Sequence, residues 1–181
     1  MEKNKIRKSI LKVRKLKYDK NLAINFKNFK NLLTKKKIYN GYIGGYFPVN
    51  YEIDCLKILS KLETDKFKIS LPKIKKNNLM DFFKYSFRDP LKLNKYGIPE
   101  PINNSKIYPD VIIVPLVAFN DELFRIGYGG GYYDRYIQKL IKKKKFLTIG
   151  FAFSFQKVPK FRVDTFDKSL DFIMTERKIY K

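Results

Sequence analysis

Residues 110–119, DVIIVPLVAF, form a nearly continuous apolar run that ends shortly before a cluster of glycines. Such a run is typical of a strand buried inside a sheet. FLTIGFAF at 146–153 has the same character, and a helical segment over about 130–145 separates the two. Strands that alternate with helices favour an α/β fold with parallel strand pairing. We therefore expect an open, mostly parallel sheet with helices on both faces: a three-layer, Rossmann-like single domain over residues 1–181.

The hydropathy pattern predicts the remaining elements. Ile6, Ile10 and Val13 recur at helical spacing, and Asp19 is a candidate N-cap for a second helix. Residues 88–108 hold several prolines and are expected to form a long loop. The expected helices are 3–16, 20–34, 52–63 and about 130–145, and the expected strands are 39–49, 67–72, 78–86, 110–119, 146–153 and 171–176.

The chain is strongly basic, with 40 Lys and Arg against 17 Asp and Glu, a net charge of +23. A positive field attracts polyanions, which include nucleic acids and phosphorylated small molecules. The lysines are spread along the whole chain, however, and Lys, Asn, Ile, Tyr and Phe are also the residues that an AT-rich genome favours. A nucleic-acid-binding protein is the alternative from another class. It would need a clustered basic face with base-stacking aromatics and a steep salt dependence of binding. We expect neither a nucleic acid nor a membrane partner.

Composition narrows the possible chemistry. The chain has no histidine, which excludes a Ser-His-Asp triad and His-based general acid–base catalysis. The lone Cys55 cannot form an internal disulfide, as suits a reducing compartment. No apolar stretch is long enough to span a bilayer, and the N-terminus lacks the pattern of a secretory signal. The expected location is the cytoplasm, and the expected state is a monomer.

The glycine cluster lies in RIGYGGGYYDRYI, residues 125–137, between a predicted strand and a predicted helix. Ligands bind open α/β sheets at this position, and a helix N-terminus preceded by glycines can hold phosphate. The spacing is neither G-x-G-x-x-G nor the P-loop pattern, and a tight turn is the simpler alternative. Arg125 could add a cation to a phosphate site. Asp134 could hold Mg²⁺, or could serve only as a favourable charge at the helix N-terminus.

The segment VPLVAFNDELFRIGYGGGYYDRYI resembles the signature of the 5-formyltetrahydrofolate cyclo-ligase family, whose members are also called 5,10-methenyltetrahydrofolate synthetases. Other family-like segments follow the family order along most of the chain. They are KNKIR at 3–7, GGYFPVNYEID at 44–54, YGIPEP at 96–101, IGFAFSFQKV at 149–158 and VDTFDKSLDFIMTE at 163–176.

The resemblance implies that the chain uses ATP and Mg²⁺ to convert 5-formyltetrahydrofolate into 5,10-methenyltetrahydrofolate through a phosphorylated formyl intermediate, with release of ADP and phosphate. It also implies a role for each matched residue. Arg125 and Arg135 would act in catalysis, and Asp134 and Asp167 would bind Mg²⁺. ATP would contact Lys3, Arg7, Arg125, Ile126, Gly127, Tyr128, Gly129, Gly130, Gly131, Tyr132 and Tyr133. The folate would contact Phe47, Glu52, Tyr128, Gly129, Gly130, Gly131 and Tyr132.

Read without the resemblance, these residues have simpler roles. Lys3 and Arg7 would be part of a solvated helix face, Glu52 a first-turn acid and Phe47 a core residue. Phe82, Phe83 and Tyr85 could wall a pterin, although core packing is the more usual role for such residues. The chain departs from the family pattern at Leu116, Asn120 and 162–167, but not within the glycine loop. A phosphate-binding relative that has lost the folate site is the third possibility.

Overall fold

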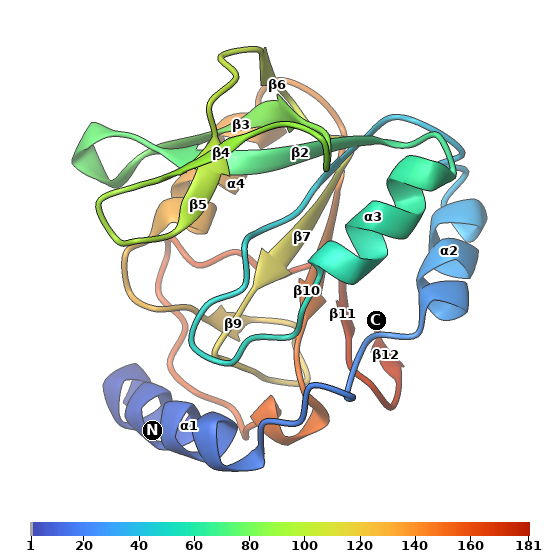
Figure 1. Ribbon diagram of the computed structural model, residues 1–181. Coiled ribbons are helices and arrows are strands. Elements are labelled where there is room, and N and C mark those ends of the chain that lie inside the picture. Colours follow the sequence, from blue (N-terminus) through green and yellow to red (C-terminus); the bar gives the residue numbers. More distant parts are fainter. Residues whose placement is uncertain (1) are drawn as a thin grey trace.

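Figure 1 shows the computed structural model, which describes residues 2–181 as an α/β fold around an eight-stranded sheet. The five central strands are parallel, and β12, β3 and β6 add antiparallel edges. The strands, in sheet order, are β12 (Ile179–Tyr180), β11 (Phe172–Met174), β10 (Leu147–Phe151), β7 (Val111–Pro115), β1 (Tyr42–Gly44), β2 (Lys68–Ile74), β3 (Met80–Tyr85) and β6 (Lys106–Ile107). The helices are α1 (Lys3–Lys17), α2 (Phe26–Lys35), α3 (Leu56–Thr64) and α4 (Tyr132–Ile141).

The side chains of β7 show why helices cover both faces of the sheet. Successive residues of a strand point to opposite faces. Val111 and Ile113 pack in one core cluster with the buried residues of α2 and α3, whereas Ile112 and Val114 pack in another with those of α4. All four are fully buried. The predicted three-layer α/β arrangement is therefore confirmed (Figure 1).

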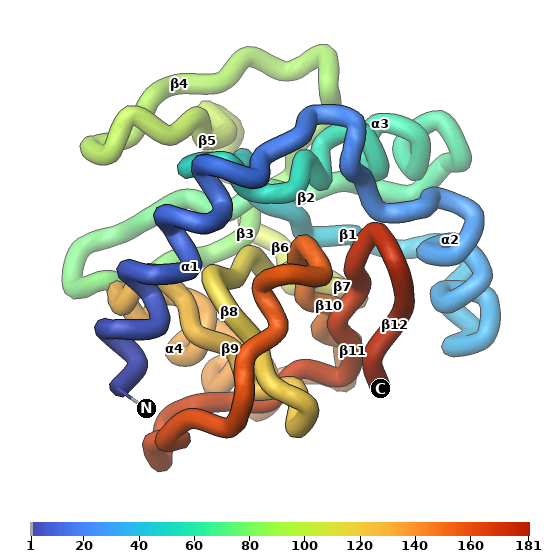
Figure 2. The backbone as a smooth tube through the Cα atoms, turned by 90° about the horizontal axis from the view of Figure 1, so that it is seen from below, coloured from blue at the N-terminus to red at the C-terminus, as the bar shows by residue number. Residues whose placement is uncertain are grey.

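Helix α1 lies away from both helical layers. Ile6 packs against Ala118, Ile126 and Phe161, which belong to a small third cluster. Ala118 and Ile126 are in the hairpin of β8 (Ala118–Phe119) and β9 (Arg125–Ile126), which follows the carboxyl end of β7. Figure 2 shows α1 alongside this hairpin. The N-terminal helix thus lies at the edge where the parallel strands end.

The second helix begins later than predicted. It starts at Phe26 rather than near residue 20, because Asn25 and not Asp19 is its N-cap. The Asn25 side chain accepts a hydrogen bond from the Asn28 amide at 3.0 Å, whereas Asp19 caps a short turn by accepting from the Asn21 amide. The N-cap prediction was wrong because two side chains of the same capping class compete within six residues.

Residues 88–108 are not the long loop that was predicted. They contain β4 (Leu91–Leu93) and β5 (Pro99–Pro101), which pair as an antiparallel hairpin, followed by β6. Proline is compatible with this hairpin because an edge strand leaves backbone positions that need no N–H donor. The other predicted elements are present, but they are shorter or have shifted ends; the apolar run at 110–119 breaks after Pro115.

The aromatics of β3 belong to the core. Phe82 is fully buried, and Phe83 and Tyr85 are 7% exposed. Core packing, the more usual role, is therefore the one that the structure shows for these rings. No helix among residues 2–181 is long and apolar enough to cross a membrane.

Asp81 on β3 holds three elements together. Its buried carboxylate accepts from Lys75 at 2.7 Å, Lys106 at 3.0 Å and Lys139 of α4 at 2.7 Å. Burial alone would raise the pKa of Asp81, but hydrogen bonds from the three lysines lower it to about 2. One carboxylate thus offsets the mutual repulsion of three cations.

We expect Asp81→Asn to lower the free energy of unfolding by about 2 kcal/mol at pH 7, because three ammonium groups then lose their shared anion. In the wild type, the ionised Asp81 carboxylate makes its full contribution to the free energy of unfolding above the normal Asp pKa, and this contribution is lost as pH falls through about 2. The difference between the two proteins should therefore shrink between pH 4 and pH 2. Urea unfolding across that range measures it. An equal difference at pH 7 and pH 2 would contradict the ionic explanation.

Candidate active site

A cavity of about 980 Å³ lies at the carboxyl ends of β1 and β7. Its walls come from α1, the segment after β1, the β4–β5 hairpin, the glycine loop with the start of α4, and the turn at 164–167. The sequence-predicted site residues all line this one cavity: Lys3, Arg7, Phe47, Glu52, Arg125, Ile126, Gly127, Tyr128, Gly129, Gly130, Gly131, Tyr132, Tyr133, Asp134, Arg135 and Asp167. The fold therefore brings together residues that are far apart in the chain.

The glycine loop adopts conformations that other residues rarely take. Gly129 has φ +98° and Gly131 has φ +67°, which is the left-handed region that favours glycine. Gly131 is also the N-cap of α4, so the first N–H groups of that helix face the cavity end of the loop. Gly127 differs from both, because a Cβ atom placed there would meet nothing within 4 Å. At Gly127 the structure offers open space next to the backbone rather than an unusual turn.

This contrast yields a matched pair of substitutions. Gly131→Ala should lower the free energy of unfolding by about 1–2 kcal/mol, because alanine is strained at positive φ and its Cβ would lie 2.6 Å from the Arg135 guanidinium. The motif resemblance implies that this loop holds the phosphates of ATP; in that case Gly127→Ala should leave the melting temperature unchanged but raise KM for ATP by about tenfold, because the methyl group would occupy space that a phosphate needs. Thermal unfolding and steady-state kinetics measure the two effects. An unchanged KM in Gly127→Ala would remove this stretch of backbone from the nucleotide site.

Two cations of α1 bind other walls of the cavity: Arg7 contacts the glycine loop and Lys3 contacts the turn at 164–167. Arg7 Nε donates to the Gly127 carbonyl at 2.7 Å. Lys3 Nζ donates to Asp164 at 2.6 Å and also to Asp167. Burial lowers the pKa of Lys3, but its hydrogen bonds to the two carboxylates outweigh this effect and the pKa is raised. Neither side chain belongs to a purely solvated helix face.

Arg125 and Asp134 form a pair at the base of the cavity. The Arg125 side chain is 4% exposed and donates from Nη2 to Asp134 Oδ1 at 2.8 Å and from Nη1 to the Lys168 carbonyl at 3.1 Å. Burial lowers the pKa of Arg125, while Asp134 and, less strongly, Asp167 raise it. Both carboxylates therefore act electrostatically on the same guanidinium.

The residues present fit a magnesium ion that arrives with a nucleotide. Among residues 2–181 no three His, Cys, Asp or Glu side chains are grouped so that they could hold a metal by themselves. Mg²⁺ in nucleotide sites, however, takes only one or two protein carboxylates and fills the rest of its octahedron with phosphate oxygens and water. Asp134 and Asp167 supply that number of carboxylates on the cavity wall, where Arg125 and Lys3 now pair with them.

Arg135 binds backbone rather than another side chain. Its Nε and Nη2 donate to the Asn78 carbonyl at 3.1 Å and 2.9 Å, and Nη2 also donates to the Gly130 carbonyl. The Tyr132 hydroxyl reaches the Asn78 side chain and the Tyr96 hydroxyl, each at 3.2 Å. These contacts connect the glycine loop to the turn between β2 and β3 and to the β4–β5 hairpin.

Phe47 and Glu52 lie in the segment after β1 and line the cavity. Glu52 is 5% exposed; its Oε2 accepts from the Val49 amide at 2.9 Å, and its buried Oε1 has no hydrogen-bond partner among the described residues. Burial raises the pKa of Glu52 to about 7, against smaller lowering effects of the Val49 amide, the Arg14 charge and the Tyr128 hydroxyl. A buried acceptor without a partner is suited to a ligand that brings hydrogen-bond donors.

The cavity also includes residues that the sequence analysis missed. Tyr96 is 56% exposed and comes from the hairpin that was predicted to be a loop. Phe166 is 72% exposed and lies between Asp164 and Asp167 on the turn that Lys3 holds. Tyr96 begins the family-like segment YGIPEP, and Phe166 lies within the family-like segment at 163–176, so both segments were usable signals.

Comparison with known proteins agrees with the motif resemblance. The model of the 5-formyltetrahydrofolate cyclo-ligase family matches residues 1–176. The 5-formyltetrahydrofolate cyclo-ligase of Mycoplasma genitalium is 35% identical over 155 residues, which is 83% of this chain and 81% of that protein. The enzyme of the same name from Haemophilus influenzae is 32% identical over 148 residues, which is 77% of each chain.

Solved structures of similar proteins agree with the fold. The 5,10-methenyltetrahydrofolate synthetase of Aquifex aeolicus matches with a TM-score of 0.76 at 28% identity, covering 100% of this chain and 93% of that one. The 5,10-methenyltetrahydrofolate synthetase of Mycoplasma pneumoniae matches with a TM-score of 0.74 at 26% identity, covering 98% and 100%. The similarity therefore extends over the whole sheet and the cavity at its edge.

Proposed function

The chain belongs to the 5-formyltetrahydrofolate cyclo-ligase family and is therefore a ligase, and from this premise we propose that it converts 5-formyltetrahydrofolate and ATP into 5,10-methenyltetrahydrofolate, ADP and phosphate with the help of Mg²⁺. The observation that carries the proposal is the gathering of every predicted site residue along one cavity, with cations and the glycine loop lining it together with Glu52. The functional unit is one domain over residues 1–181 that acts as a monomer in the cytoplasm.

The nucleotide would lie along the α1 side of the cavity. Lys3 and Arg7 would neutralise phosphate oxygens, and the backbone of residues 125–133 would curl around them at the N-terminus of α4. The open space beside Gly127 supports close approach of a phosphate to the backbone.

Asp134 and Asp167 would hold the magnesium ion, which when bound neutralises phosphate charge and fixes the geometry of the triphosphate. To do so, Asp167 would exchange its contact with Lys3 for the ion, and Lys3 would turn to a phosphate. Arg125 would keep the Asp134 carboxylate in place from beneath.

The reaction needs positioning and charge stabilisation rather than a protein nucleophile. The formyl oxygen attacks the γ-phosphorus, the bond to the ADP oxygen breaks, and an iminium phosphate results. N10 then attacks the same carbon and loses its proton, and the formyl oxygen departs in the phosphate as the ring closes. Arg125 and Arg135 would stabilise the negative charge on the transferred phosphoryl group. A chain without histidine can support every step.

The folate would occupy the side of the cavity that Phe47 and Glu52 border. A pterin presents an N3–H and an amino group next to each other, and a carboxylate accepts such a donor pair in bidentate fashion. The free Oε1 of Glu52 supports this role. Tyr128, Gly129, Gly130, Gly131 and Tyr132 would border both ligands.

The test is a rise in absorbance at the methenyltetrahydrofolate band after the purified protein is mixed with Mg·ATP and 5-formyltetrahydrofolate. The rise should require ATP and should disappear in Asp134→Ala. A folded protein that binds ATP without producing the band would mean that this chain has a phosphate site but acts on a different substrate.

A further inference from the structure

Arg14 is a buried cation that none of the family-like segments includes. It lies in the C-terminal half of α1, is 1% exposed, and is among the largest fully buried side chains. Nη1 donates to the Leu116 carbonyl at 3.2 Å, Nη2 donates to the Tyr128 hydroxyl, and Nε has no hydrogen-bond partner in the described part of the chain. No carboxylate among residues 2–181 forms an ion pair with it. Burying an unpaired charge is costly, so a structural role alone explains the residue poorly.

The contacts of Arg14 connect the two sides of the cavity. Tyr128 belongs to the glycine loop, and its ring centroid lies 5.6 Å from Arg14 Cζ. Tyr128 and Glu52 line the same cavity, and the Arg14 charge and the Tyr128 hydroxyl both lower the pKa of that carboxylate. Arg14 of α1, Tyr128 of the glycine loop and Glu52 on the proposed folate side thus form a row of three side chains, and Arg14 is its positively charged member.

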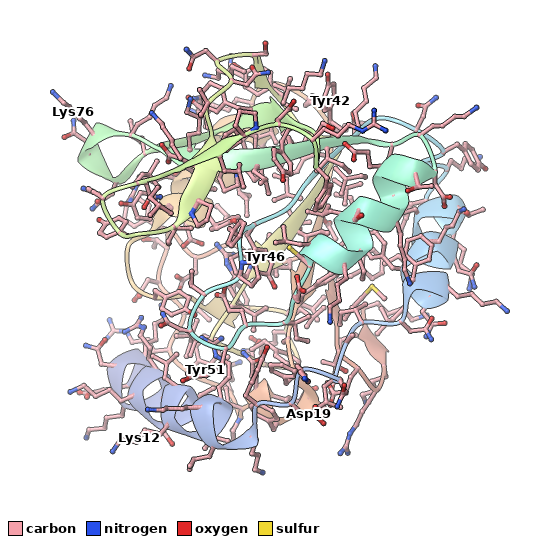
Figure 3. The ribbon with its side chains drawn as sticks, viewed as in Figure 1. Lys12, Asp19, Tyr42, Tyr46, Tyr51 and Lys76 are labelled. Atoms are coloured by element: carbon pink, nitrogen blue, oxygen red, sulfur yellow. The ribbon has the colours of Figure 1, made fainter. Side chains whose placement is uncertain are left out.

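The other groups that face Glu52 cannot replace this charge. Burial raises the pKa of Tyr46, Cys55 and Tyr133 above their ordinary values, so all three stay neutral at physiological pH. Figure 3 places Tyr46 inside the molecule near α3, whose N-cap is Cys55. The nearest acidic neighbour in sequence, Asp54, turns to the amide of Leu56 instead.

We propose that Arg14 is a positioning residue that couples the two substrate subsites: its guanidinium fixes Tyr128 of the glycine loop and supplies the positive charge that keeps Glu52 able to bind the pterin as a carboxylate. The assignment of the pterin rests on the proposed function, whereas the link from Arg14 to Glu52 does not. The coupling also explains why α1 carries nucleotide-facing residues at one end and a buried arginine at the other.

The experiment compares Arg14→Met with Lys12→Met, a change of similar size on the exposed face of the same helix (Figure 3). The Glu52 carboxyl is followed by NMR in protein labelled with carbon-13 at the glutamate side-chain carboxyl, its signal assigned by its loss in Glu52→Gln. In Arg14→Met this carboxyl should titrate at higher pH than in the wild type, because a positive charge that lowers its pKa has been removed. Lys12→Met should leave the titration unchanged.

Kinetics provide the second readout. In Arg14→Met the KM for 5-formyltetrahydrofolate should rise about tenfold at pH 7 and return toward the wild-type value at pH 9, where Glu52 is ionised again. A merely structural role would raise KM equally at both pH values. An Arg14→Met protein that is folded, with an unmoved Glu52 titration and no pH-dependent KM change, would overturn the proposal.

A second variant keeps the test decisive if Arg14→Met does not fold. Tyr128 is 40% exposed, so Tyr128→Phe should preserve the fold while it removes the hydroxyl that Arg14 binds. The KM for both substrates should then rise, and unchanged values would overturn the coupling. Absence of any turnover by the wild type would refute the proposed reaction alone, since the NMR titration needs no substrate.

Discussion

Asp134→Asn is expected to reduce kcat/KM for cyclisation by about a thousandfold while the protein stays folded. Asparagine has nearly the same shape, and its oxygen can still accept from Arg125, which donates to Asp134 at 2.8 Å in the wild type. What disappears is the negative charge beside the proposed phosphate site. The proposed magnesium ion thereby loses one of the two carboxylates, Asp134 and Asp167, that are assigned to it. Steady-state kinetics at several Mg²⁺ concentrations, together with a melting curve, measure the effect.

A matched comparison separates metal binding from the general charge of the cavity. Asp164 and Asp167 both accept from Lys3, but only Asp167 is assigned to the ion. Asp167→Asn should also lower kcat/KM strongly and raise the Mg²⁺ concentration that the reaction requires. Asp164→Asn, at a side chain that is 57% exposed, should lower kcat/KM at most a fewfold. Equal losses in the two variants would argue against a specific metal role.

Glu52→Gln is expected to impair the reaction and stabilise the protein at the same time. Kinetically, kcat/KM for 5-formyltetrahydrofolate should fall about a hundredfold, because the amide NH₂ would face pterin donors instead of accepting from them. The loss should appear mainly in KM for the folate, with KM for ATP little changed.

The stability effect follows from the raised pKa of Glu52. This pKa is about 7 in the folded protein against 4.5 for the free side chain. The protonated Glu52 therefore makes its full contribution to the free energy of unfolding below pH 4.5, and this contribution is lost as the pH rises through about 7. Glutamine carries no charge. Glu52→Gln should therefore match the wild type at pH 4 and be more stable by about 2–3 kcal/mol at pH 8. Glu122→Gln, at a surface carboxylate paired with Lys160, should change neither kcat/KM nor the free energy of unfolding. A Glu52→Gln protein less stable than the wild type at pH 8 would contradict this account of the cavity.

The central sheet could be predicted because its strands are buried on both faces. The runs at 110–119 and 146–153 leave few alternatives to parallel strands under helices, and β7 and β10 lie within them. Element boundaries were less predictable, because they depend on competing local groups. Asn25 rather than Asp19 caps α2, and the hairpin of β4 and β5 forms in a proline-rich stretch because its strands lie outside the central sheet.

The candidate site could be predicted residue by residue only where motifs exist. Glycines, flanking charges and the order of the segments pointed to residues that the fold gathers around one cavity. No local pattern could reveal that Lys3 reaches Asp167, 164 positions away, or that Arg14 would be buried rather than solvated on α1. Such contacts depend on where α1 packs, and the packing of Ile6 against the β8–β9 hairpin is a tertiary event.

The most direct test of the proposed chemistry follows the formyl oxygen. 5-Formyltetrahydrofolate labelled with oxygen-18 in the formyl group is incubated with the protein and Mg·ATP, and the released phosphate is analysed by mass spectrometry. We expect one labelled oxygen in phosphate for each methenyl product formed, since in the proposed reaction the formyl oxygen attacks the γ-phosphorus and leaves with it. Product formed without ATP, or with the label in water and unlabelled phosphate, would contradict phosphoryl transfer to the formyl group at this site.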